Sequence, residues 1–259
     1  MVISLDGEWL LATDPHNIGR ERQWYARPVP EAKPTRVPWI IQEAFPGYHG
    51  VAWYWREFVA SANPYTQGRY LLRFWAVDYQ AEVWLNGALM GEHEGGETPF
   101  VLDVTDVIQP EANNRLAVRV LNPTHEPIDG IVLNQTPHRN KVIPYTAGGS
   151  YNHGGIVDSV ELLVVPAVRV EDLFVQPEIE TGVLRIQANV HNAQNSSVRG
   201  SIEFMVAPAT SGETLAVIRL VREVPPGDTL IEAHLQVGNP RLWELNDPYL
   251  YRVTARVWT

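Results

Sequence analysis

The chain has 259 residues, of which 45% are hydrophobic and 10% aromatic, a composition that can fill two domain cores, although one large all-β domain would also fit this length. Its formal net charge of -10 and the absence of any basic run argue against a nucleic-acid partner, because phosphate binding depends on clustered Lys and Arg. Cysteine is absent, which excludes disulfides, thiolate nucleophiles and cysteine-ligated metals.

The N-terminus offers no targeting signal. The stretch "MVISLDGEWLLATDP" lacks a basic segment followed by a long apolar one, so it is not typical of a signal peptide. No apolar run approaches the roughly 20 residues that a membrane span needs. We therefore expect no membrane partner, and the lack of cysteine fits a cytoplasmic location.

The first element that the sequence places clearly is a β-hairpin at "AEVWLNGALMGEH", residues 81–93. Two strand-like runs flank Asn86-Gly87, the dipeptide that best tolerates the positive φ angles of a type I′ turn. The second run is predicted to end near Gly95-Gly96, and the next strand is predicted to begin at Phe100.

Ionisable residues crowd the end of this hairpin, at Glu92, His93, Glu94 and Glu97. A zinc-protease motif needs a second His one helical turn after the first, and Glu97 occupies that position. The carboxylates of a glycosidase must face each other across a substrate, whereas Glu92 and Glu94 are expected on one face of an exposed strand. We interpret the cluster as the polar edge of a sheet. The sequence implies no metal and no organic cofactor.

The dominant pattern along the chain is alternation of apolar and polar residues with period two. Successive side chains of a strand face opposite ways, so each alternating segment is expected to bury one face and expose the other. Turn residues separate the segments, which indicates antiparallel sandwiches and predicts an all-β fold. In chain order the segments are "FVLDVTDV" (100–107), "RLAVRVL" (115–121), "VLRIQANVHN" (183–192), "LIEAHLQVG" (230–238) and "YRVTARVW" (251–258).

One long segment, residues 122–155, departs from this rhythm and offers at most one strand-like piece, near 131–133. Irregular segments of this length are uncommon in compact domains and tend to be functional. Rings and hydrogen-bonding groups together suit a sugar, whose faces are apolar and whose rim is hydroxyls. The alternative is a long loop that packs on its own domain or a neighbour with its polar groups solvated. The segment collects His125, His138, Arg139, Asn140, Lys141, Tyr145, Tyr151, Asn152 and His153.

A domain boundary is predicted at "LLVVPAVRVEDLFVQP". One strand ends near Val165, Pro166 interrupts the pattern, and a new set of alternating strands follows. The sequence thus predicts a first domain over residues 1–165 and a second over 167–259.

A series of motifs, in order, resembles glycoside hydrolase family 2, the family of β-galactosidases, β-glucuronidases and β-mannosidases. The first-domain motifs are similar to the sugar-binding sandwich of that family, and "NPRLWELNDPYLYRVTARV" is similar to its immunoglobulin-like second domain. The first-domain motifs are "LDGEWLLATDP", "VPWIIQ", "HGVAWYWREF", "LLRFWAVDYQAEVWLNGALMGEHEGGETPFVLDVTDVI", "NNRLAVRVLNP" and "GGIVDSVELLVVP".

The resemblance implies a jelly-roll-like, galactose-binding β-sandwich, then an immunoglobulin-like β-sandwich, then a (β/α)8 barrel that carries both catalytic glutamates. This chain stops at Thr259, before any barrel and, on this alignment, before the last strand of the second domain. The resemblance therefore implies the non-catalytic portion of a retaining exo-glycosidase, β-galactosidase-like, whose partners are a carbohydrate and the missing barrel. Its expected tasks are to shape the active-site cleft and to support the barrel or a homo-oligomer interface.

The resemblance also implies where a sugar would be touched. An acidic residue that contacts the sugar in relatives matches Gly149 here, so that contact is lost or supplied elsewhere, with Asn152 as the substitute. A second contact falls near His49. Together with the ring and amide groups of the long segment, the candidate substrate-binding residues are His49, Tyr151, Asn152, His153, His138 and Arg139.

Two alternatives stay open from the sequence: a stand-alone carbohydrate-binding module, and a scaffold for docking or oligomerisation. If the second domain lacks its final strand, residues 249–258 should lie at a sheet edge with unpaired backbone groups. We expect this segment to pair with a neighbouring molecule or to be poorly ordered.

Overall fold

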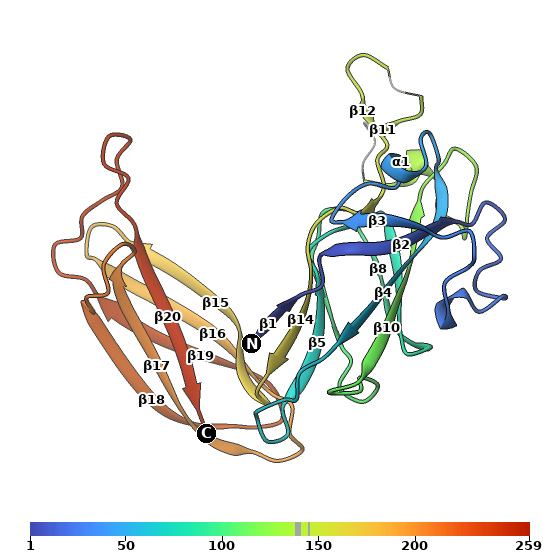
Figure 1. Ribbon diagram of the computed structural model, residues 1–259. Coiled ribbons are helices and arrows are strands. Elements are labelled where there is room, and N and C mark those ends of the chain that lie inside the picture. The colour runs from blue at the N-terminus through green and yellow to red at the C-terminus, as the bar shows by residue number, and fades with distance from the viewer. Residues whose placement is uncertain (138–140, 145) are drawn as a thin grey trace. The chain divides into compact units, whose positions relative to one another are not determined.

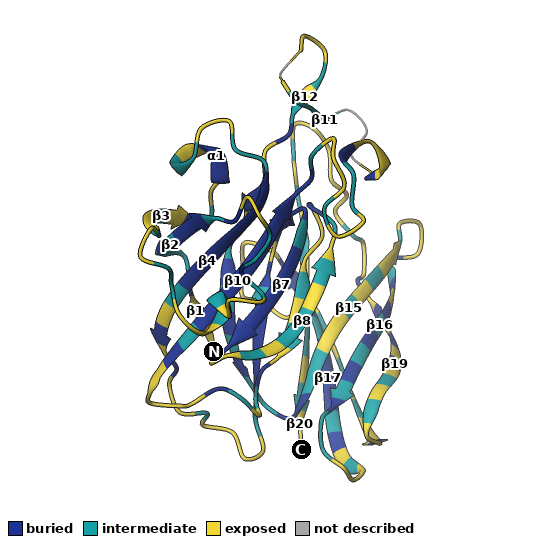
Figure 2. Cartoon of the chain, turned by 90° about the vertical axis from the view of Figure 1, so that its right-hand side faces the viewer, coloured by how far each residue is buried: buried dark blue, intermediate teal, exposed yellow. Residues whose placement is uncertain are grey.

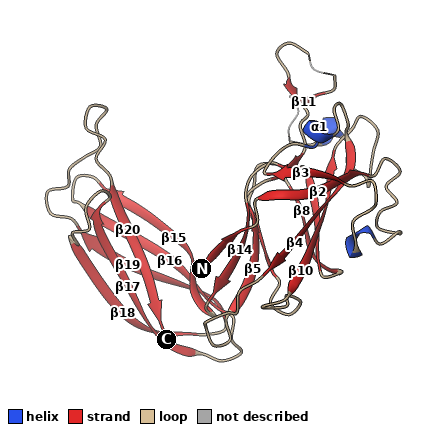
Figure 3. Cartoon of the chain, viewed as in Figure 1, coloured by secondary structure: helices blue, strands red, loops and turns tan. Residues whose placement is uncertain are grey.

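The computed structural model describes residues 1–137, 141–144 and 146–259, and nearly all of its regular structure is strand (Figure 3). The chain divides into two compact units. Unit 1 comprises Met1–Pro64 and Arg69–Val165, and unit 2 comprises Tyr65–Gly68 and Pro166–Thr259. The prediction of an all-β fold is confirmed.

Unit 1 is a sandwich of a six-stranded sheet, in the order β3-β2-β4-β10-β7-β8, and a four-stranded sheet, in the order β1-β14-β5-β9 (Figure 1). Its main core lies between the two sheets and combines Tyr54, Val118 and Val120 of the larger with Leu72 and Leu162 of the smaller. The strands are β1 (Val2–Ser4), β2 (Gly7–Thr13), β3 (Lys33–Val37), β4 (Gly50–Val59), β5 (Arg69–Phe74), β6 (Val77–Asp78), β7 (Gln80–Leu85), β8 (Ala88–Glu94), β9 (Phe100–Asp103), β10 (Asn113–Asn122), β11 (Lys141–Val142), β12 (Ser150–Tyr151), β13 (Gly155–Ile156) and β14 (Val160–Val165).

Helices in the described residues are few and short: 3-10 helices η1 (Trp24–Ala26) and η2 (Leu133–Gln135) and the α-helix α1 (Ile41–Ala44). None of the helices in the described ranges has both the length and the apolar character needed to cross a membrane. Helix α1 lies at the same end of unit 1 as β11 and β12 (Figure 1).

The predicted hairpin is confirmed as β7 and β8, which pair antiparallel around Asn86 and Gly87. Both turn residues have positive φ, 51° and 86°, as a type I′ turn requires. Strand β8 is the edge of the six-stranded sheet, and Figure 2 shows it more exposed than the buried strands β4, β10 and β7.

The expectation that each alternating segment exposes one face is wrong for β10. Leu116, Val118 and Val120 face the main core, whereas Ala117 and Leu121 belong to a second core on the opposite face of the sheet. This second core forms because the chain between β2 and β3 and the chain after β10 cover that face of the sheet. It is rich in aromatic rings. Its members include Trp53, Trp55 and Trp84, with Trp24, Tyr25, Val29, Ile128 and Ile131 packed against them.

The double coverage buries a charge. Arg119 on β10 is fully buried, and its guanidinium donates to Glu82 at 2.7 Å, to Asp129 at 2.6 Å and to Asn17 at 2.8 Å. Arg20 also pairs with Glu82 and with Asp129. A buried guanidinium is tolerated only when its charge is balanced, and Glu82 and Asp129 supply that balance although Arg119 Nε has no hydrogen-bond partner among the described residues. The network therefore fixes the two covering segments to the sheet.

Unit 2 is a sandwich of two three-stranded sheets, in the orders β15-β16-β19 and β18-β17-β20. The predicted alternation is confirmed in β16, where Leu184, Ile186, Ala188 and Val190 all enter the core. The strands are β15 (Val168–Glu178), β16 (Val183–Asn192), β17 (Val198–Pro208), β18 (Ala216–Val224), β19 (Gly227–Gln236) and β20 (Tyr251–Trp258).

Strand β20 occupies the predicted place at a sheet edge. The predicted fraying is wrong, because all eight of its residues pair antiparallel with β17, from Tyr251 opposite Pro208 to Trp258 opposite Ser201. Its other flank has no neighbour in the sheet order of the described residues, so pairing with another molecule stays a prediction.

Replacing Arg119 by Met tests the buried network. The change leaves Glu82 and Asp129 without one of their cations, and we expect the free energy of unfolding to fall by about 3–5 kcal/mol. The measurement is urea unfolding followed by tryptophan fluorescence, which reports on Trp53, Trp55 and Trp84 in unit 1.

The matched control is Arg115→Met on the same strand, where the half-buried arginine pairs with exposed Glu57 at 2.6 Å and donates to the carbonyl of Ala26 at 2.6 Å. A solvent-accessible ion pair contributes about 0–1 kcal/mol and one hydrogen bond about 1 kcal/mol, so the control should lose clearly less stability than Arg119→Met. Equal losses in the two variants would contradict the role given to the buried network.

Candidate functional site

The long segment after β10 contains more regular structure than expected, but in pieces too short to show alternation. Strands β11 and β12 are two residues each and pair in parallel, Lys141 opposite Ser150 and Val142 opposite Tyr151. The strand-like piece predicted near 131–133 is instead a single bridge between Ile128 and Ile131, followed by helix η2. Among these described residues no strand forms beyond this bridge, and Ile131 packs against the second core on its own.

Three buried side-chain amides lie beneath this segment, on Gln42 of α1, Asn122 at the end of β10, and Asn152. Asn122 Nδ2 donates to Asn152 Oδ1 at 3.2 Å, and Asn152 Nδ2 donates to the carbonyl of Pro123 at 2.7 Å. Gln42 Nε2 donates to Asn122 Oδ1 at 3.1 Å and to the carbonyl of Tyr48 at 2.7 Å. Their polar atoms satisfy one another, as buried amides must.

Three rings lie next to the amides: His49, Tyr151 and His153. The centroids of His49 and Tyr151 are 5.4 Å apart, and those of Tyr151 and His153 are 4.9 Å apart, both edge to face. His49 and Tyr151 are partly exposed and His153 is exposed. We call these three residues the ring cluster.

The amides determine the tautomer of His49. Because Asn122 Nδ2 is used by Asn152, its Oδ1 faces His49 Nδ1, 2.8 Å away. An amide oxygen only accepts, so Nδ1 must carry the proton. The lone pair of Nε2 is then free to accept the hydroxyl of Tyr151, at 3.1 Å. Within the described residues no donor is bonded to that hydroxyl oxygen, so its lone pairs are available to a ligand.

The surroundings of His49 favour its neutral form. Burial lowers the pKa of His49 below the ordinary 6.5, and the nearby His153 and His125 act in the same direction, while the hydrogen bond with Asn122 opposes them. Since the unfolded chain binds this proton more readily, the contribution of His49 to stability is complete above about pH 6.5. It is lost progressively as the pH falls from there towards the folded-state pKa.

His49 also lines a hollow of about 420 Å³, within the usual size range of ligand pockets. Asp129 contributes a carboxylate to this hollow, and although burial opposes it, Arg119 and Arg20 hold the pKa of Asp129 below its usual range. The group is therefore an ionised acceptor and not an acid. The other lining residues are Asp14, Pro15, His16, Asn17, Tyr48, Gly50, Val51, Thr124, Pro127 and Ile128.

The arrangement is suited to holding a hydroxylated ligand. It offers hydrogen-bonding groups of both kinds beside aromatic edges, but His49 is paired with an amide and a phenol and not with a nucleophile. Among the described residues, no group of three or more His, Asp or Glu is placed to hold a metal ion. Around the hairpin, Glu92 and Glu94 are exposed on edge strand β8, and His93 stacks on Phe100 with ring centroids 4.4 Å apart.

The structure brings together four of the six residues predicted to bind substrate: His49, Tyr151, Asn152 and His153. Asn152 is fully buried with both ends of its amide engaged inside the protein, so its place is beneath the ring cluster. The predictions for His138 and Arg139 lie outside the described residues. Gly149 is in a turn, where its N–H donates to the carbonyl of Thr146 at 3.1 Å.

Sequence reasoning did not select Gln42 and Asn122, which hold the cluster in place. A signal for both was present, because each is a polar residue at the end of an apolar run, "VPWII" for Gln42 and "LAVRVL" for Asn122. A polar group in such a position must find buried partners.

Two glycines allow the segment to reach these amides. A Cβ on Gly154 would lie 2.4 Å from the side chain of Asn122. Gly155 has a φ of +139°, and a Cβ there would lie 2.8 Å from the carbonyl oxygen of Trp39. The close approach is used by two backbone hydrogen bonds, from Ile41 N–H to Gly154 O at 2.7 Å and from Trp39 N–H to Ile156 O at 2.9 Å.

Both units match known sequence families. Residues 37–166 match the family described as "Glycosyl hydrolases family 2, sugar binding domain", and residues 168–259 match "Glycosyl hydrolases family 2". The chain belongs to glycoside hydrolase family 2. The resemblance seen in the sequence is thereby confirmed.

Relatives within family 2 extend along almost the whole chain. A β-glucuronidase of Rattus norvegicus is 30% identical over 95% of this chain and 39% of its own length. A β-galactosidase of Thermoanaerobacter pseudethanolicus is 26% identical over 81% of this chain and 26% of its own length. The structure of a Ruminococcus gnavus β-glucuronidase in complex with D-glucaro-δ-lactam superimposes with a TM-score of 0.76 at 25% identity, covering 100% of this chain and 43% of that one. The chain thus spans well under half the length of these relatives.

Replacing Tyr151 by Phe tests the hydrogen-bond order of the ring cluster. The change removes the donor that stabilises neutral His49, so we expect the pKa of His49 to rise towards 6.5. The measurement is an NMR pH titration of the imidazole nitrogens, which in the parent should show the proton on Nδ1. His191 in unit 2, bonded to Asp228, is the control that should not respond. A proton on Nε2 of His49 would contradict the assignment.

Replacing Gly155 by Ala tests the close approach to Trp39. We expect a larger loss of stability than from Gly87→Ala, which changes the conformational preference of the hairpin turn but meets no atom within 4 Å. The turn variant should lose about 1–2 kcal/mol of unfolding free energy. The difference between the variants, measured by thermal unfolding, reports the overlap with the Trp39 carbonyl. The approach would not be tight if both variants lost the same amount.

Proposed function

We propose that this chain is the N-terminal, non-catalytic portion of an exo-glycosidase of family 2, β-galactosidase-like in architecture, which hydrolyses terminal β-linked sugars with retention. Retaining hydrolysis proceeds through a covalent glycosyl-enzyme and needs two carboxyl groups about 5–5.5 Å apart. In this proposal the catalytic barrel carries those groups. The lengths of the relatives support it, since the chain covers 39% of the rat β-glucuronidase and 43% of the R. gnavus enzyme.

The observation that carries the proposal is the ring cluster on its amide support. Buried Gln42, Asn122 and Asn152 fix the positions of His49 and Tyr151, whose outer faces stay partly exposed. A positioned donor and acceptor beside aromatic edges serves to orient a sugar without cleaving it. We propose that the ring cluster forms part of the wall of the cleft in which the barrel binds its substrate.

A second candidate is a stand-alone carbohydrate-binding module. The description of residues 37–166 as a sugar-binding domain and the hollow beside His49 favour it. The two candidates differ in what the isolated chain does. A module binds glycans at micromolar to millimolar concentration by itself, whereas an accessory portion needs its barrel.

The test compares the chain with a protein extended through its downstream coding sequence, using a panel of p-nitrophenyl β-glycosides that includes the glucuronide and the galactoside. We expect no turnover by the chain alone, and turnover by the extended protein. In the extended protein, Tyr151→Phe and His49→Ala should raise KM more than they lower kcat, because they remove binding contacts.

A variant away from the cluster, Trp75→Phe, should leave both constants unchanged. Turnover by the purified chain would overturn the non-catalytic assignment. Glycan binding by the chain together with an extended protein that lacks activity would favour the binding module.

A further inference from the structure

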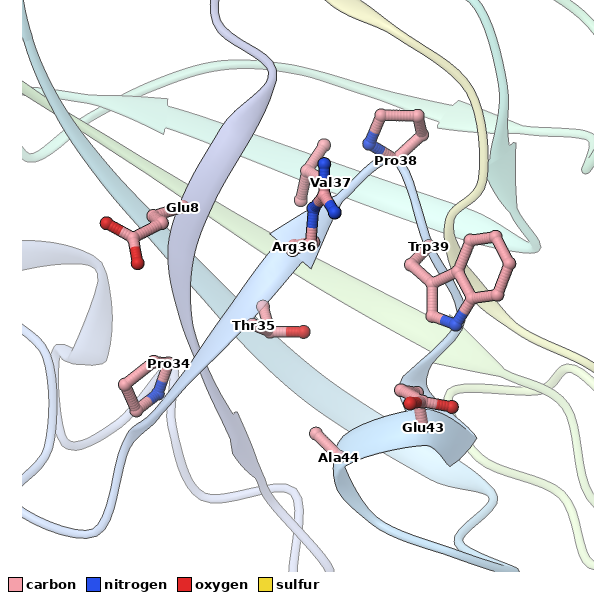
Figure 4. A pocket seen from close by; sticks show the side chains of 9 residues that line it. All are labelled: Glu8, Pro34, Thr35, Arg36, Val37, Pro38, Trp39, Glu43 and Ala44. Atoms are coloured by element: carbon pink, nitrogen blue, oxygen red, sulfur yellow. The ribbon is translucent and has the colours of Figure 1, made fainter.

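A second hollow, of about 750 Å³, is lined by Trp39, whose N–H is hydrogen-bonded to Ile156 beside the pair Gly154-Gly155, here called the glycine step. Its most prominent side chain is Trp39, which is 54% exposed. Figure 4 shows Trp39 and Glu43 bordering this hollow together with Arg36 of β3 and Glu8 of β2. The remaining lining residues are Pro34, Thr35, Val37, Pro38 and Ala44.

The backbone under Trp39 is held firmly although its ring is exposed. The flanking side chains of Val37 and Ile41 are buried in the main core, at 2% and 0% exposure. The N–H groups of Trp39 and Ile41 donate to Ile156 and Gly154 across the glycine step. The indole is thus an exposed flat surface carried by a fixed backbone, so no backbone conformational entropy is lost when a ligand stacks on it.

The charged groups of the hollow have capacity left for a ligand. Glu8 and Arg36 are opposite one another in the register of β2 and β3, and both are exposed. Within the part of the chain that the structure describes, the side chains of Arg36, Glu8 and Glu43 form neither a hydrogen bond nor an ion pair, and the indole N–H of Trp39 is also free. The hollow thus offers unused donors and acceptors around an aromatic face.

We propose that this hollow is a second carbohydrate subsite, which takes a neutral pyranose ring. The apolar face of the sugar stacks on Trp39, Arg36 donates to its hydroxyls, and Glu43 and Glu8 accept from them. Two carboxylates and one guanidinium give the lining a net charge of -1. That sign disfavours a uronate, whose carboxylate would be repelled, and selects for uncharged sugars.

The ligand class rests on the proposed function, which makes carbohydrate the ligand of this chain. The position of the subsite does not rest on it. The backbone of Trp39 is bonded to the residues that follow His153, so the proposed subsite and the ring cluster are carried by adjoining stretches of main chain.

The experiment is an NMR titration of the chain with methyl β-D-glucopyranoside and, separately, with methyl β-D-glucopyranosiduronate. We expect the indole N–H resonance of Trp39 to shift with the neutral sugar at millimolar concentration, and the uronate to bind at least several-fold more weakly. Trp39→Ala should abolish saturable binding at this site. Glu43→Gln should narrow the preference for the neutral sugar, because it removes one of the two negative charges.

The matched control is Trp75→Ala, which removes another exposed tryptophan, 40% exposed, that does not line the hollow. The proposal is overturned if Trp39 does not shift at 100 mM sugar, if Trp39→Ala binds as the parent does, or if the uronate binds as well as the neutral sugar. Binding that His49→Ala abolishes and Trp39→Ala leaves intact would place the sugar at the ring cluster instead. None of these failures bears on the turnover assay of the extended protein, so the two proposals fail separately.

Discussion

Strand β10 has to be covered on both of its faces, and this requirement organises unit 1. One face packs in the main core and the other lies under an aromatic layer that includes Trp53, Trp55 and Trp84. Because Arg119 is on the covered outer face, its charge must be paired, and its partners Asp129 and Asn17 come from the covering segments. The same strand ends in Asn122, which supports the ring cluster. Stability and the candidate site are thus joined through one strand.

The polar contacts around Arg119 and those around Asn122, both on β10, differ in chemistry. Around Arg119 the contacts are ionic and buried, so that they fix the covering segments in place. Around Asn122 they are neutral amides, which leave the adjacent imidazole uncharged and its hydrogen-bond direction defined. A neutral, directed donor–acceptor chain is useful for orienting hydroxyl groups, whereas an ionic one would hold a counterion. The description of the family that residues 37–166 match, a sugar binding domain, agrees with this difference.

Much of the fold could be predicted from the sequence, because strand alternation and turn residues are local signals. The Asn86-Gly87 hairpin and strand β16 were both placed by such patterns. The burial of Arg119 could not be predicted, since alternation gives the face of a residue but not what covers it. Of the candidate site, Tyr151 and His153 were selected from the composition of the long segment and His49 from the family resemblance, but only the structure shows that the three rings are neighbours. Gln42 and Asn122 beneath them were missed because their role depends on contacts 30 to 112 positions apart in the chain.

The pair Gly154-Gly155 has a consequence for how this end of the sandwich can vary. On one side its backbone touches the amide layer, and on the other it touches the carbonyl of Trp39, with no space for a methyl group at either point. A side chain at Gly154 would press on Asn122, which supports the imidazole, and one at Gly155 would press on the carbonyl of Trp39. The main chain at Gly154-Gly155 therefore links the ring cluster to Trp39 with no side chain between them, so a change in the proposed ligand preference would have to come from the surrounding residues.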